Sequence, residues 1–330
     1  MSNIEEYKNI VLKYIKEENI SSVQLIANRV IVSINQSEDD TLKLQIKQEI
    51  EAYDSQKIAN VVFVQEKKET PNVQDKWQIK GVKKIIAVSS AKGGVGKSTT
   101  SVNLALSLAN QGLKVALFDA DIYGPSIPTM LGYDKVPPVS YDGKIFEPFM
   151  ECGVKSMSIG SMLKDDTALI WRGAKACGAI EQLLTQTNWG SVDVMVIDMP
   201  PGTGDIQITM SQKINFNGAV IVSTPQDIAL IDAVKGINLF NKIGVPVLGV
   251  VENMSYYICE HCGTRADIFG HGGAEKTAKK YGVDFLGAIP LHYDIRVNSD
   301  SGTPIVLSNP ESEHTKSYEN ISSKIMEKIK

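Results

Sequence analysis

The chain has 330 residues, of which 43% are apolar and 22% charged, and a formal net charge of −4. This composition is typical of a globular protein with one large core and a smaller unit, and its acidic balance argues against a nucleic-acid partner. No apolar run reaches the ~18 residues that a membrane span needs. The polar start MSNIEEYKNI lacks the layout of a signal peptide, so we expect a cytoplasmic protein without stable membrane insertion.

Residues 1–66 predict a small αββαβ unit of the α+β class. The expected order is a helix over 4–18, two short strands around a turn within 22–35, a helix over 39–53 and a strand over 58–65. Asp39 or Asp40 is the expected cap of the second helix.

A change of composition separates this unit from the rest of the chain. Residues 67–82 are polar, include a proline and lack periodicity, which is typical of a linker. Over 83–330, apolar runs alternate with helical stretches, which predicts an α/β domain with a mostly parallel sheet flanked by helices. Ligands of such sheets bind beyond the carboxyl ends of the strands. Five runs mark the expected strands: 83–90, 114–121, 192–200, 218–225 and 245–254.

The first of these strands leads into a phosphate-binding loop, AKGGVGKST, which opens a helix. Strand, glycine loop and helix in this order are the context of a P-loop, whose backbone N–H groups and helix N-terminus bind phosphate. Lys97 is expected to reach the β- and γ-phosphates, and the Ser98 hydroxyl is expected to bind Mg²⁺. The expected nucleotide-binding residues are Ala91, which replaces the usual glycine, Lys92, Gly93, Gly94, Val95, Gly96, Lys97, Ser98 and Thr99.

Acidic residues follow two further strands. Asp119 and Asp121 end one strand, and Asp198 ends another. Carboxylates at neighbouring strand tips can hold Mg²⁺ through water and can orient an attacking water molecule. Aspartates at such positions also cap helices, so both roles stay open at this point. The segment PPGTGD, residues 200–205, is predicted to be a switch that senses the γ-phosphate.

A CxxC motif lies near the end of the α/β domain. Cys259 and Cys262 supply two thiolates, which is half of what a tetrahedral zinc or a [4Fe–4S] cluster needs. Cys152 and Cys177 are distant in sequence, and His261 and His271 are possible zinc ligands. A two-fold dimer would supply four thiolates from two CxxC motifs. A bridging cluster, a zinc ion and a redox pair all remain open on this reasoning.

The loop resembles the deviant P-loop of the MinD, ParA and nitrogenase-iron-protein class. In that class, a second lysine crosses a dimer interface and contacts the nucleotide of the partner. The resemblance gives this role to Lys92, which would stabilise charge on the transferred phosphoryl group together with Lys97. It also implies that Asp121 activates water, that Asp198 contacts Mg²⁺ through water, and that Asn253 in VENMS binds the adenine edge of ATP.

Several phrases between residues 83 and 305 resemble one family in combination: DADIYGPSIPTMLG, WRGAKACGAIEQLL, VIDMPPGTGDIQITMSQ, VSTPQDIALIDAVKG and VENMSYYICEHCG. They are similar to the Mrp/ApbC-type iron–sulfur cluster carriers, which are P-loop ATPases. The resemblance implies a homodimer that binds a labile [4Fe–4S] cluster at Cys259 and Cys262. Such a carrier works with scaffold proteins, transfers the cluster to apo iron–sulfur proteins, and couples this cycle to ATP binding and hydrolysis.

The resemblance has further consequences for the organisation of the chain. The family often carries an N-terminal iron–sulfur-assembly domain with an Asp-Pro-Glu turn and a reactive cysteine, and residues 1–66 have neither. We therefore expect this degenerate unit to dock partners. The helices that follow Asp121 and the Gly202–Asp205 switch are expected to transmit nucleotide binding to the CxxC motif.

Two rival functions remain. One is a positioning ATPase of the MinD/ParA sort, whose membrane contact would be the apolar stripe of Ile321, Ile325, Met326 and Ile329 near the C-terminus. The other is a zinc-stapled dimeric ATPase that carries no cluster.

Overall fold

The computed structural model describes residues 4–26, 28–36, 39–63, 76–162 and 173–329. The chain divides into two compact units, an N-terminal unit of Met1–Asn72 and a second unit of Val73–Lys330. Residues 67–75 of the predicted linker lie outside the described residues, as do Trp171 and Arg172 of the WRGAKACG phrase.

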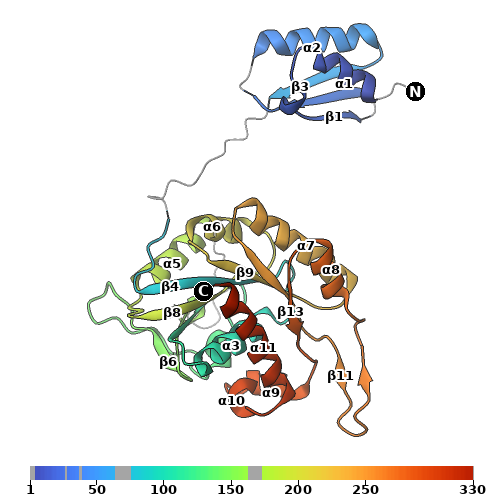
Figure 1. Cartoon of the computed structure of the whole chain (residues 1–330). Helices are drawn as coiled ribbons and strands as arrows, with labels where there is room; N and C mark the ends of the chain where they lie inside the picture. The colour runs from blue at the N-terminus through green and yellow to red at the C-terminus, as the bar shows by residue number, and fades with distance from the viewer. Residues whose placement is uncertain (1–3, 27, 37–38, 64–75, 163–172, 330) are drawn as a thin grey trace. The chain divides into compact units, whose positions relative to one another are not determined.

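The N-terminal unit has the predicted αββαβ order (Figure 1). Its sheet has the order β1-β2-β3, in which β1 and β2 are antiparallel and β2 and β3 are parallel. The first helix is shorter than predicted, because it ends at Leu12 and a short 3₁₀ turn follows. Asp39 caps the second helix by accepting hydrogen bonds from the backbone of Thr41 and Leu42. The elements are α1 (Ile4–Leu12), η1 (Glu17–Asn19), β1 (Ile20–Ile26), β2 (Arg29–Ile34), α2 (Asp40–Tyr53) and β3 (Ile58–Phe63).

The second unit is built on an 8-stranded sheet with the order β13-β10-β9-β4-β8-β5-β7-β6. All neighbouring strands are parallel except β6 and β7, which confirms the predicted mostly parallel sheet. The five predicted runs form β4 (Val82–Ser89), β5 (Val115–Asp119), β8 (Val192–Asp198), β9 (Gly218–Ser223) and β10 (Val247–Glu252). Three further strands were not predicted, because they are short, lie toward the sheet edges and lack a long apolar run: β6 (Phe149–Glu151), β7 (Val154–Ser158) and β13 (Phe285–Ala288).

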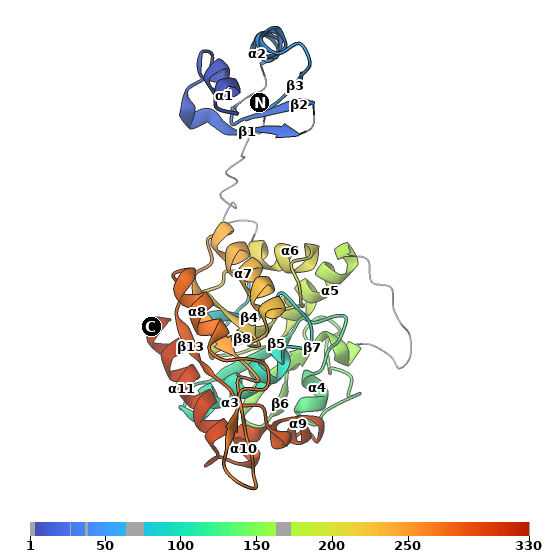
Figure 2. The same cartoon turned by 90° about the vertical axis from the view of Figure 1, so that its right-hand side faces the viewer.

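Helices cover both faces of this sheet (Figures 1 and 2). Side chains alternate along each strand, so Ile85 and Ala87 belong to one core and Ile86 and Val88 to the other. The first core is closed by α5 (Gly173–Gln186), α6 (Asp205–Lys213), α7 (Asp227–Lys242) and α8 (Gly273–Lys280). The second is closed by α3 (Lys97–Asn110), α4 (Ile127–Met130), α10 (Ile305–Ser308) and α11 (Glu313–Lys328), with Ile295 of α9 (Tyr293–Asp300) packed against it.

Two further features bear on the sequence predictions. The last part of the predicted linker packs on the second unit, because the Trp77 backbone donates to the Lys213 carbonyl at 2.8 Å and its ring lies against the first core. The apolar stripe of α11 is buried against the sheet, with Ile325 fully enclosed. Among the described helices, none has the length and apolar character that crossing a membrane requires.

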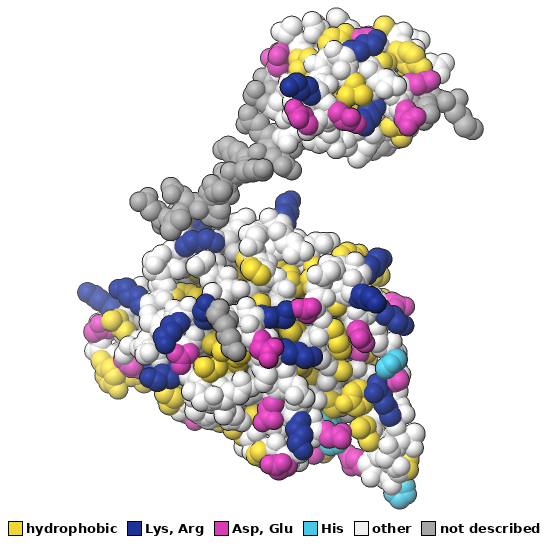
Figure 3. Space-filling model, in the orientation of Figure 1, with side chains coloured by type: hydrophobic (Ala, Val, Ile, Leu, Met, Phe, Trp, Pro, Cys, Tyr) yellow, Lys and Arg dark blue, Asp and Glu magenta, His cyan; other side chains and the backbone are white. Residues whose placement is uncertain are grey.

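A small hairpin extends from the carboxyl side of the sheet, and in Figure 3 it forms a tapered projection of the second unit. Its strands are β11 (Tyr257–Ile258) and β12 (Arg265–Ala266), which pair in antiparallel fashion. Elsewhere, η3 (Ile159–Met162) follows β7. In the view of Figure 3, basic and acidic side chains are interspersed over the surface of this unit.

Candidate functional site

The phosphate-binding loop lies where β4 ends and α3 begins. Gly96 is the N-cap of α3 and has a left-handed backbone, with φ of 79°. A Cβ atom at this position would lie 2.1 Å from Nδ2 of Asn253. Glycine is therefore required at this position by both backbone and space. The Val95 side chain is buried, whereas Gly93 and Gly94 are exposed and accessible to a ligand.

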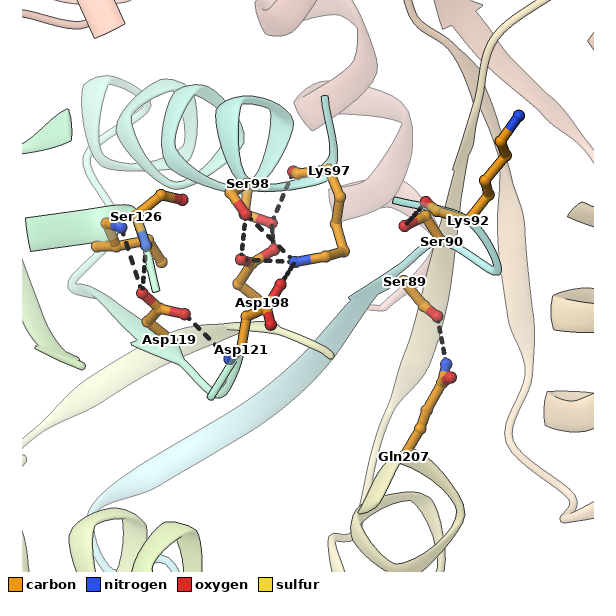
Figure 4. Close-up of polar contacts among 12 residues, drawn as sticks. Ser89, Ser90, Lys92, Lys97, Ser98, Asp119, Asp121, Ser126, Asp198 and Gln207 are labelled. Carbon is orange, nitrogen blue, oxygen red and sulfur yellow. Dashed lines mark hydrogen bonds and ion pairs between the residues drawn. The ribbon is translucent and has the colours of Figure 1, made fainter. Parts of the chain in front are cut away.

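Lys97 is buried at the first turn of α3 and lies among carboxylates from two strand ends (Figure 4). Its Nζ is 2.7 Å from Oδ2 of Asp198 and 3.6 Å from Oδ2 of Asp121. A buried ammonium group needs such partners, because removing one member of a buried ion pair costs roughly 3–5 kcal/mol. The loop lysine and the two strand-end aspartates, which are far apart in sequence, thus form one cluster.

Two hydroxyl groups of α3 hold the Asp198 carboxylate. Ser98 donates to Oδ2 at 2.6 Å, and Ser101 donates to Oδ1 at 2.6 Å. Ser101 was not predicted from the sequence, although its spacing from Ser98 places both residues on one helical face. The hydroxyl of Ser98 and the carboxylates are hard oxygen donors, which are the ligands that Mg²⁺ prefers. The residues at this point therefore fit the predicted magnesium ion.

Asp119 and Asp121 have different roles, although they are close in sequence. The fully buried Asp119 carboxylate accepts hydrogen bonds from the backbones of Asp121, Ser126 and Ile127 and from the Ser158 hydroxyl. It therefore organises the loop between β5 and α4. The Oδ1 atom of Asp121 is buried and has no hydrogen-bond partner among the described residues. Buried polar atoms are rarely left in that state, so this oxygen is suited to bind water.

The electrostatic environment raises the pKa of both carboxyl groups. Burial, reinforced by the neighbouring Asp198 carboxylate, raises the pKa of Asp119 to about 7. Burial also raises the pKa of Asp121, and the nearby Lys97 ammonium opposes this effect. A carboxylate with a raised pKa is a better proton acceptor than a solvated one.

Lys92 points away from the carboxylate cluster, as Figure 4 shows. Its side chain is exposed, while its carbonyl accepts a hydrogen bond from the Ser90 hydroxyl at 2.9 Å. The neighbouring Ala91 is half-buried, and the Ser90 carbonyl accepts from the backbone of Gly202 at 2.9 Å. The start of the loop is thus joined to the predicted switch segment, and the two lysines of the loop face opposite directions.

Asn253 lies beside the loop at the end of β10. Its Nδ2 donates to the carbonyl of Val95 at 2.9 Å. The sequence predicted a contact to adenine, and the structure adds this direct support of the loop backbone. Asn253 also lines a hollow of about 200 Å³ together with Gly96, Thr99, Met130, Met254 and Pro290.

The CxxC motif forms the turn between β11 and β12. The Gly263 backbone donates to the Cys259 carbonyl at 2.8 Å, and the Cys259 backbone donates to the Thr264 carbonyl at 3.0 Å. Cys262 is exposed, and its hydrogen bonds with Thr264 lower the pKa of its thiol. The motif thus presents its sulfurs on a protruding turn that is closed by backbone hydrogen bonds.

Of the possible additional ligands, His261 lies inside this turn, and the other three lie outside it. Cys152 lies in the turn between β6 and β7, and Cys177 lies in α5. His271 is engaged at the base of the hairpin, where its Nδ1 lies 3.2 Å from the Arg265 guanidinium. Within the described ranges, no group of three or more His, Cys, Asp and Glu side chains is arranged to hold a metal ion.

Two buried residues that sequence analysis missed support the site. Glu252, at the end of β10, accepts hydrogen bonds from the Ser255 hydroxyl and from the backbone at the start of α8, at Ala274. Gln207 of α6 donates to the Ser89 hydroxyl at 2.5 Å. The sequence signal that could have identified Glu252 is an acidic residue directly before Asn253 in the VENMS phrase.

The site combines a glycine-rich loop, the buried Lys97 and strand-end carboxylates at the carboxyl edge of a parallel sheet. This combination is typical of a P-loop NTPase. The family model described as ParA, NUBPL iron-transfer P-loop NTPase, matches residues 81–326. The chain belongs to this family. This finding confirms the resemblance to iron–sulfur cluster carriers and to the MinD/ParA class.

Two relatives are similar to this protein over most of its chain. The iron-sulfur cluster carrier protein of Escherichia coli (strain K12) is 56% identical over 253 residues, which cover 77% of this chain and 69% of that protein. The iron-sulfur cluster transfer protein NUBPL of Mus musculus is 50% identical over 254 residues, which cover 76% and 79%.

Solved structures share the fold. A nucleotide-binding protein from Archaeoglobus fulgidus, solved in complex with ADP, is 38% identical, covers 73% of this chain and 93% of its own, and has a TM-score of 0.63. The cell division ATPase MinD of Pyrococcus furiosus has a TM-score of 0.58 at 24% identity, covering 74% and 98%. At 24% identity, the MinD structure supports the fold alone.

Proposed function

We propose that the chain is an ATP-binding and ATP-hydrolysing carrier that binds a labile iron–sulfur cluster at a homodimer interface and transfers it to apo iron–sulfur proteins. The observation that carries this proposal is the CxxC turn. It presents Cys259 and Cys262 on a projecting hairpin of an iron-transfer P-loop NTPase. Two thiolates on one chain leave a cluster half-ligated, so the remaining ligands come from a second chain.

The nucleotide site is formed by the P-loop and the carboxylate cluster. The loop N–H groups and the Lys97 ammonium bind the phosphates of ATP. Ser98 would bind Mg²⁺ and Asp198 would contact it through water, and the bound ion would neutralise phosphate charge. Lys97, now 2.7 Å from Asp198, is placed to exchange a carboxylate partner for a phosphate oxygen.

Asp121 is the proposed residue for activation of the attacking water. Its buried and unpartnered Oδ1 atom can accept a hydrogen bond from water, and its raised pKa favours proton acceptance. Lys97 keeps the other oxygen of this carboxylate in position, at 3.6 Å. Asp121 thus acts on the water, whereas Asp119 acts on the shape of the loop.

The exposed side chain of Lys92 acts on the partner subunit. It points away from Lys97 and the carboxylate cluster, as the role of a signature lysine across a dimer interface requires (Figure 4). In the closed dimer, this ammonium group stabilises charge on the phosphoryl group of the neighbouring nucleotide. Hydrolysis therefore depends on the pairing of two chains.

Asn253 gives the site a preference for ATP. Its amide nitrogen is bonded to the Val95 carbonyl, so its amide oxygen is left to accept a hydrogen bond. The amino group of adenine can donate that bond, whereas guanine presents a carbonyl oxygen at the equivalent position.

The cluster is the cargo of this protein. Four thiolates from two hairpins satisfy one [4Fe–4S] cluster, and exposure of Cys262 leaves it accessible to scaffold proteins that load it and apoproteins that receive it. The four cysteines are free thiols, which suits the reducing cytoplasm that we propose as its location. The N-terminal unit contains no cysteine and is proposed to dock these partners.

Metal and sulfide analysis of anaerobically purified protein tests the proposal. The loaded wild-type chain should hold about four iron and four sulfide per two chains and should sediment as a dimer. Cys259→Ser and Cys262→Ser should reduce both contents to background and leave the fold unchanged by circular dichroism. Cys152→Ser is the matched control and should keep the full content.

Each other outcome has a definite meaning. A double Cys259→Ser, Cys262→Ser protein that still takes up iron and sulfide in full would contradict the carrier function. Stoichiometric zinc without sulfide would instead identify a zinc-stapled dimeric ATPase.

A further inference from the structure

A short two-stranded ribbon connects the nucleotide site with the CxxC turn inside a single subunit. The ribbon pairs the segment after β10 with the segment after β13. The Ile289 backbone donates to the Glu252 carbonyl at 2.8 Å, and the Ser255 backbone donates to the Ile289 carbonyl at 2.9 Å. The Leu291 backbone then donates to the Tyr256 carbonyl at 2.7 Å. These bonds run from the neighbour of Asn253 to the start of β11.

Both ends of the ribbon are fixed by side chains. At the nucleotide end, Asn253 holds the P-loop through the Val95 carbonyl, at 2.9 Å. At the hairpin end, the Arg265 guanidinium of β12 lies over the Tyr256 ring, 4.2 Å from its centroid. Arg265 also bonds Asp267 at 3.0 Å. Side-chain contacts thus hold the ribbon to the P-loop at one end and to the hairpin at the other.

His292 ends the second strand of the ribbon and lies in the wall between two hollows. The first hollow, of about 200 Å³, adjoins the P-loop at Gly96 and Thr99. The second, of about 300 Å³, adjoins the hairpin at Tyr257 and Ile268. Three residues line both hollows: Leu291, His292 and Arg296.

The His292 ring has a polar neighbour on each side. Its Nδ1 accepts from the backbone of Asp294 at 3.2 Å and so caps α9. Because Nδ1 accepts, the proton of the neutral ring resides on Nε2. Nε2 lies 3.3 Å from the Glu260 carboxylate, and Glu260 stands inside the CxxC motif, directly after Cys259. One imidazole thus contacts the helix that borders the first hollow and the turn that carries the thiols.

We propose that His292 is a positioning residue that couples occupancy of the nucleotide pocket to the orientation of the CxxC turn through the Glu260 carboxylate. This inference rests on the proposed function and names the route of its regulation. A nucleotide that enters the first hollow would contact the wall that contains His292. A shift of its ring moves Glu260 and thereby the direction in which Cys259 and Cys262 present their sulfurs.

This route differs from the one predicted from sequence. The helices after Asp121 and after the Gly202–Asp205 switch were the expected transmission elements. The ribbon is shorter, because Asn253 and Cys259 belong to the same segment of chain. It also needs no second subunit, so the thiols of one chain respond to the nucleotide of that chain.

The test measures how fast the two CxxC thiols react with a maleimide, with and without saturating Mg²⁺–ADP. A full-length Cys152→Ser, Cys177→Ser background removes the other thiols from the measurement. We expect nucleotide to change the reaction rate by roughly fivefold or more, which is the scale of allosteric coupling. Glu260→Ala should abolish this change, whereas Glu260→Gln should keep it, because the amide retains an acceptor oxygen.

His292→Asn provides the second variant. Asparagine still caps α9, but its shorter side chain cannot reach Glu260. This variant should lose the nucleotide effect as Glu260→Ala does, and the double variant should show no further loss. Glu275→Ala, which removes an exposed carboxylate of α8, is the matched control and should behave as the wild type.

The outcomes separate this inference from the function on which it rests. A nucleotide effect that persists in Glu260→Ala and His292→Asn overturns the role of His292, as does a wild-type rate that does not respond to nucleotide. Iron and sulfide analysis of the same proteins decides the carrier function independently, because the thiol measurement requires no cluster.

Discussion

Lys97 and Lys92 belong to the same loop but face different surroundings. Lys97 is buried and contacts Asp198 and Asp121, whereas Lys92 is exposed and points away from them. The cluster around Lys97 balances one ammonium group against carboxylates that would otherwise repel one another. Lys92 takes no part in that balance and is free to act on a neighbour.

Substitution of the two lysines should therefore have separable effects. Lys97→Ala should weaken Mg²⁺–ATP binding by about 100-fold or more, because it removes charge-assisted hydrogen bonds worth roughly 1.5–3 kcal/mol each. Lys92→Ala should leave binding within about threefold but lower the rate of hydrolysis by about 10³-fold, as for other residues supplied across an interface. Fluorescence titration and phosphate release measure the two quantities. Full hydrolysis by Lys92→Ala would exclude a role across the dimer.

The raised pKa of Asp119 has a consequence for stability. Its ordinary value is 3.8 and its value in the folded chain is about 7. Between these values the folded chain retains a proton that the unfolded chain loses, so the contribution of Asp119 to the free energy of unfolding falls as pH rises from about 4 to about 7.

Asp119→Asn should remove this pH dependence. The amide oxygen can still accept from the backbones of Ser126 and Ile127, but the amide nitrogen cannot accept from the backbone of Asp121. The variant should therefore be less stable than the wild type at low pH. Relative to the wild type, the variant should gain stability as pH rises through this window. Urea unfolding at about pH 4 and about pH 8 measures the difference. An equal difference at both values would show that Asp119 titrates normally.

At the scale of elements, the P-loop is shaped by β10 as well as by its own glycines. Asn253 at the end of β10 bonds the loop backbone and occupies the space beside Gly96. Glu252, one residue earlier, joins β10 to α8 and to the start of the ribbon. The same strand end thus sets the loop that binds phosphate and the segment that leads to the thiols.

Gly96→Ala tests this contact. The new Cβ atom would collide with Asn253 Nδ2 at 2.1 Å, on a backbone with φ of 79°. Gly94→Ala is the control, because Gly94 has φ of 82° and open space around it. We expect the control to lose about 1 kcal/mol of unfolding free energy from strain alone and Gly96→Ala to lose about 2–3 kcal/mol. Chemical denaturation measures both, and equal losses would mean that Asn253 moves aside freely.

At the scale of the whole molecule, the sheet separates the second unit into two cores, and α11 closes one of them. Ile321 and Ile325 of α11 pack on the strands, and Lys324 donates to the Leu286 carbonyl at 2.7 Å. The stripe that a membrane-binding ATPase would display is therefore used inside the protein. This packing argues against the C-terminal helix as a membrane anchor.

Substitutions in α11 should behave as core substitutions. Ile325→Ala should lower the free energy of unfolding by about 2–4 kcal/mol, because it leaves a cavity. Glu327→Ala changes an exposed residue of the same helix, and its free energy of unfolding should stay within about 0.5 kcal/mol of the wild-type value. Denaturant unfolding measures both, and sedimentation with liposomes should show no binding of either protein. A neutral Ile325→Ala combined with liposome binding would restore the positioning ATPase as a candidate.

Patterns that are local in the chain were predictable from sequence. The order of the N-terminal elements, the five central strands and the P-loop context depend on periodicity and on glycine at fixed spacing, which short-range physics determines. The pair of thiols at Cys259 and Cys262 was equally visible. The short strands toward the sheet edges were not, because β6 and β13 contain few residues and are only half-buried.

Contacts between distant segments required the tertiary structure. The sequence identified Lys97, Asp121 and Asp198, but only the parallel register of β5 and β8 places these two strand ends side by side. The same holds for Asn253 against Val95 and for His292 against Glu260. The sequence by itself determined the class of chemistry, through residue types in local patterns. The fold decided which side chains meet, because a contact depends on the packing of whole strands and helices, and no local pattern encodes that packing.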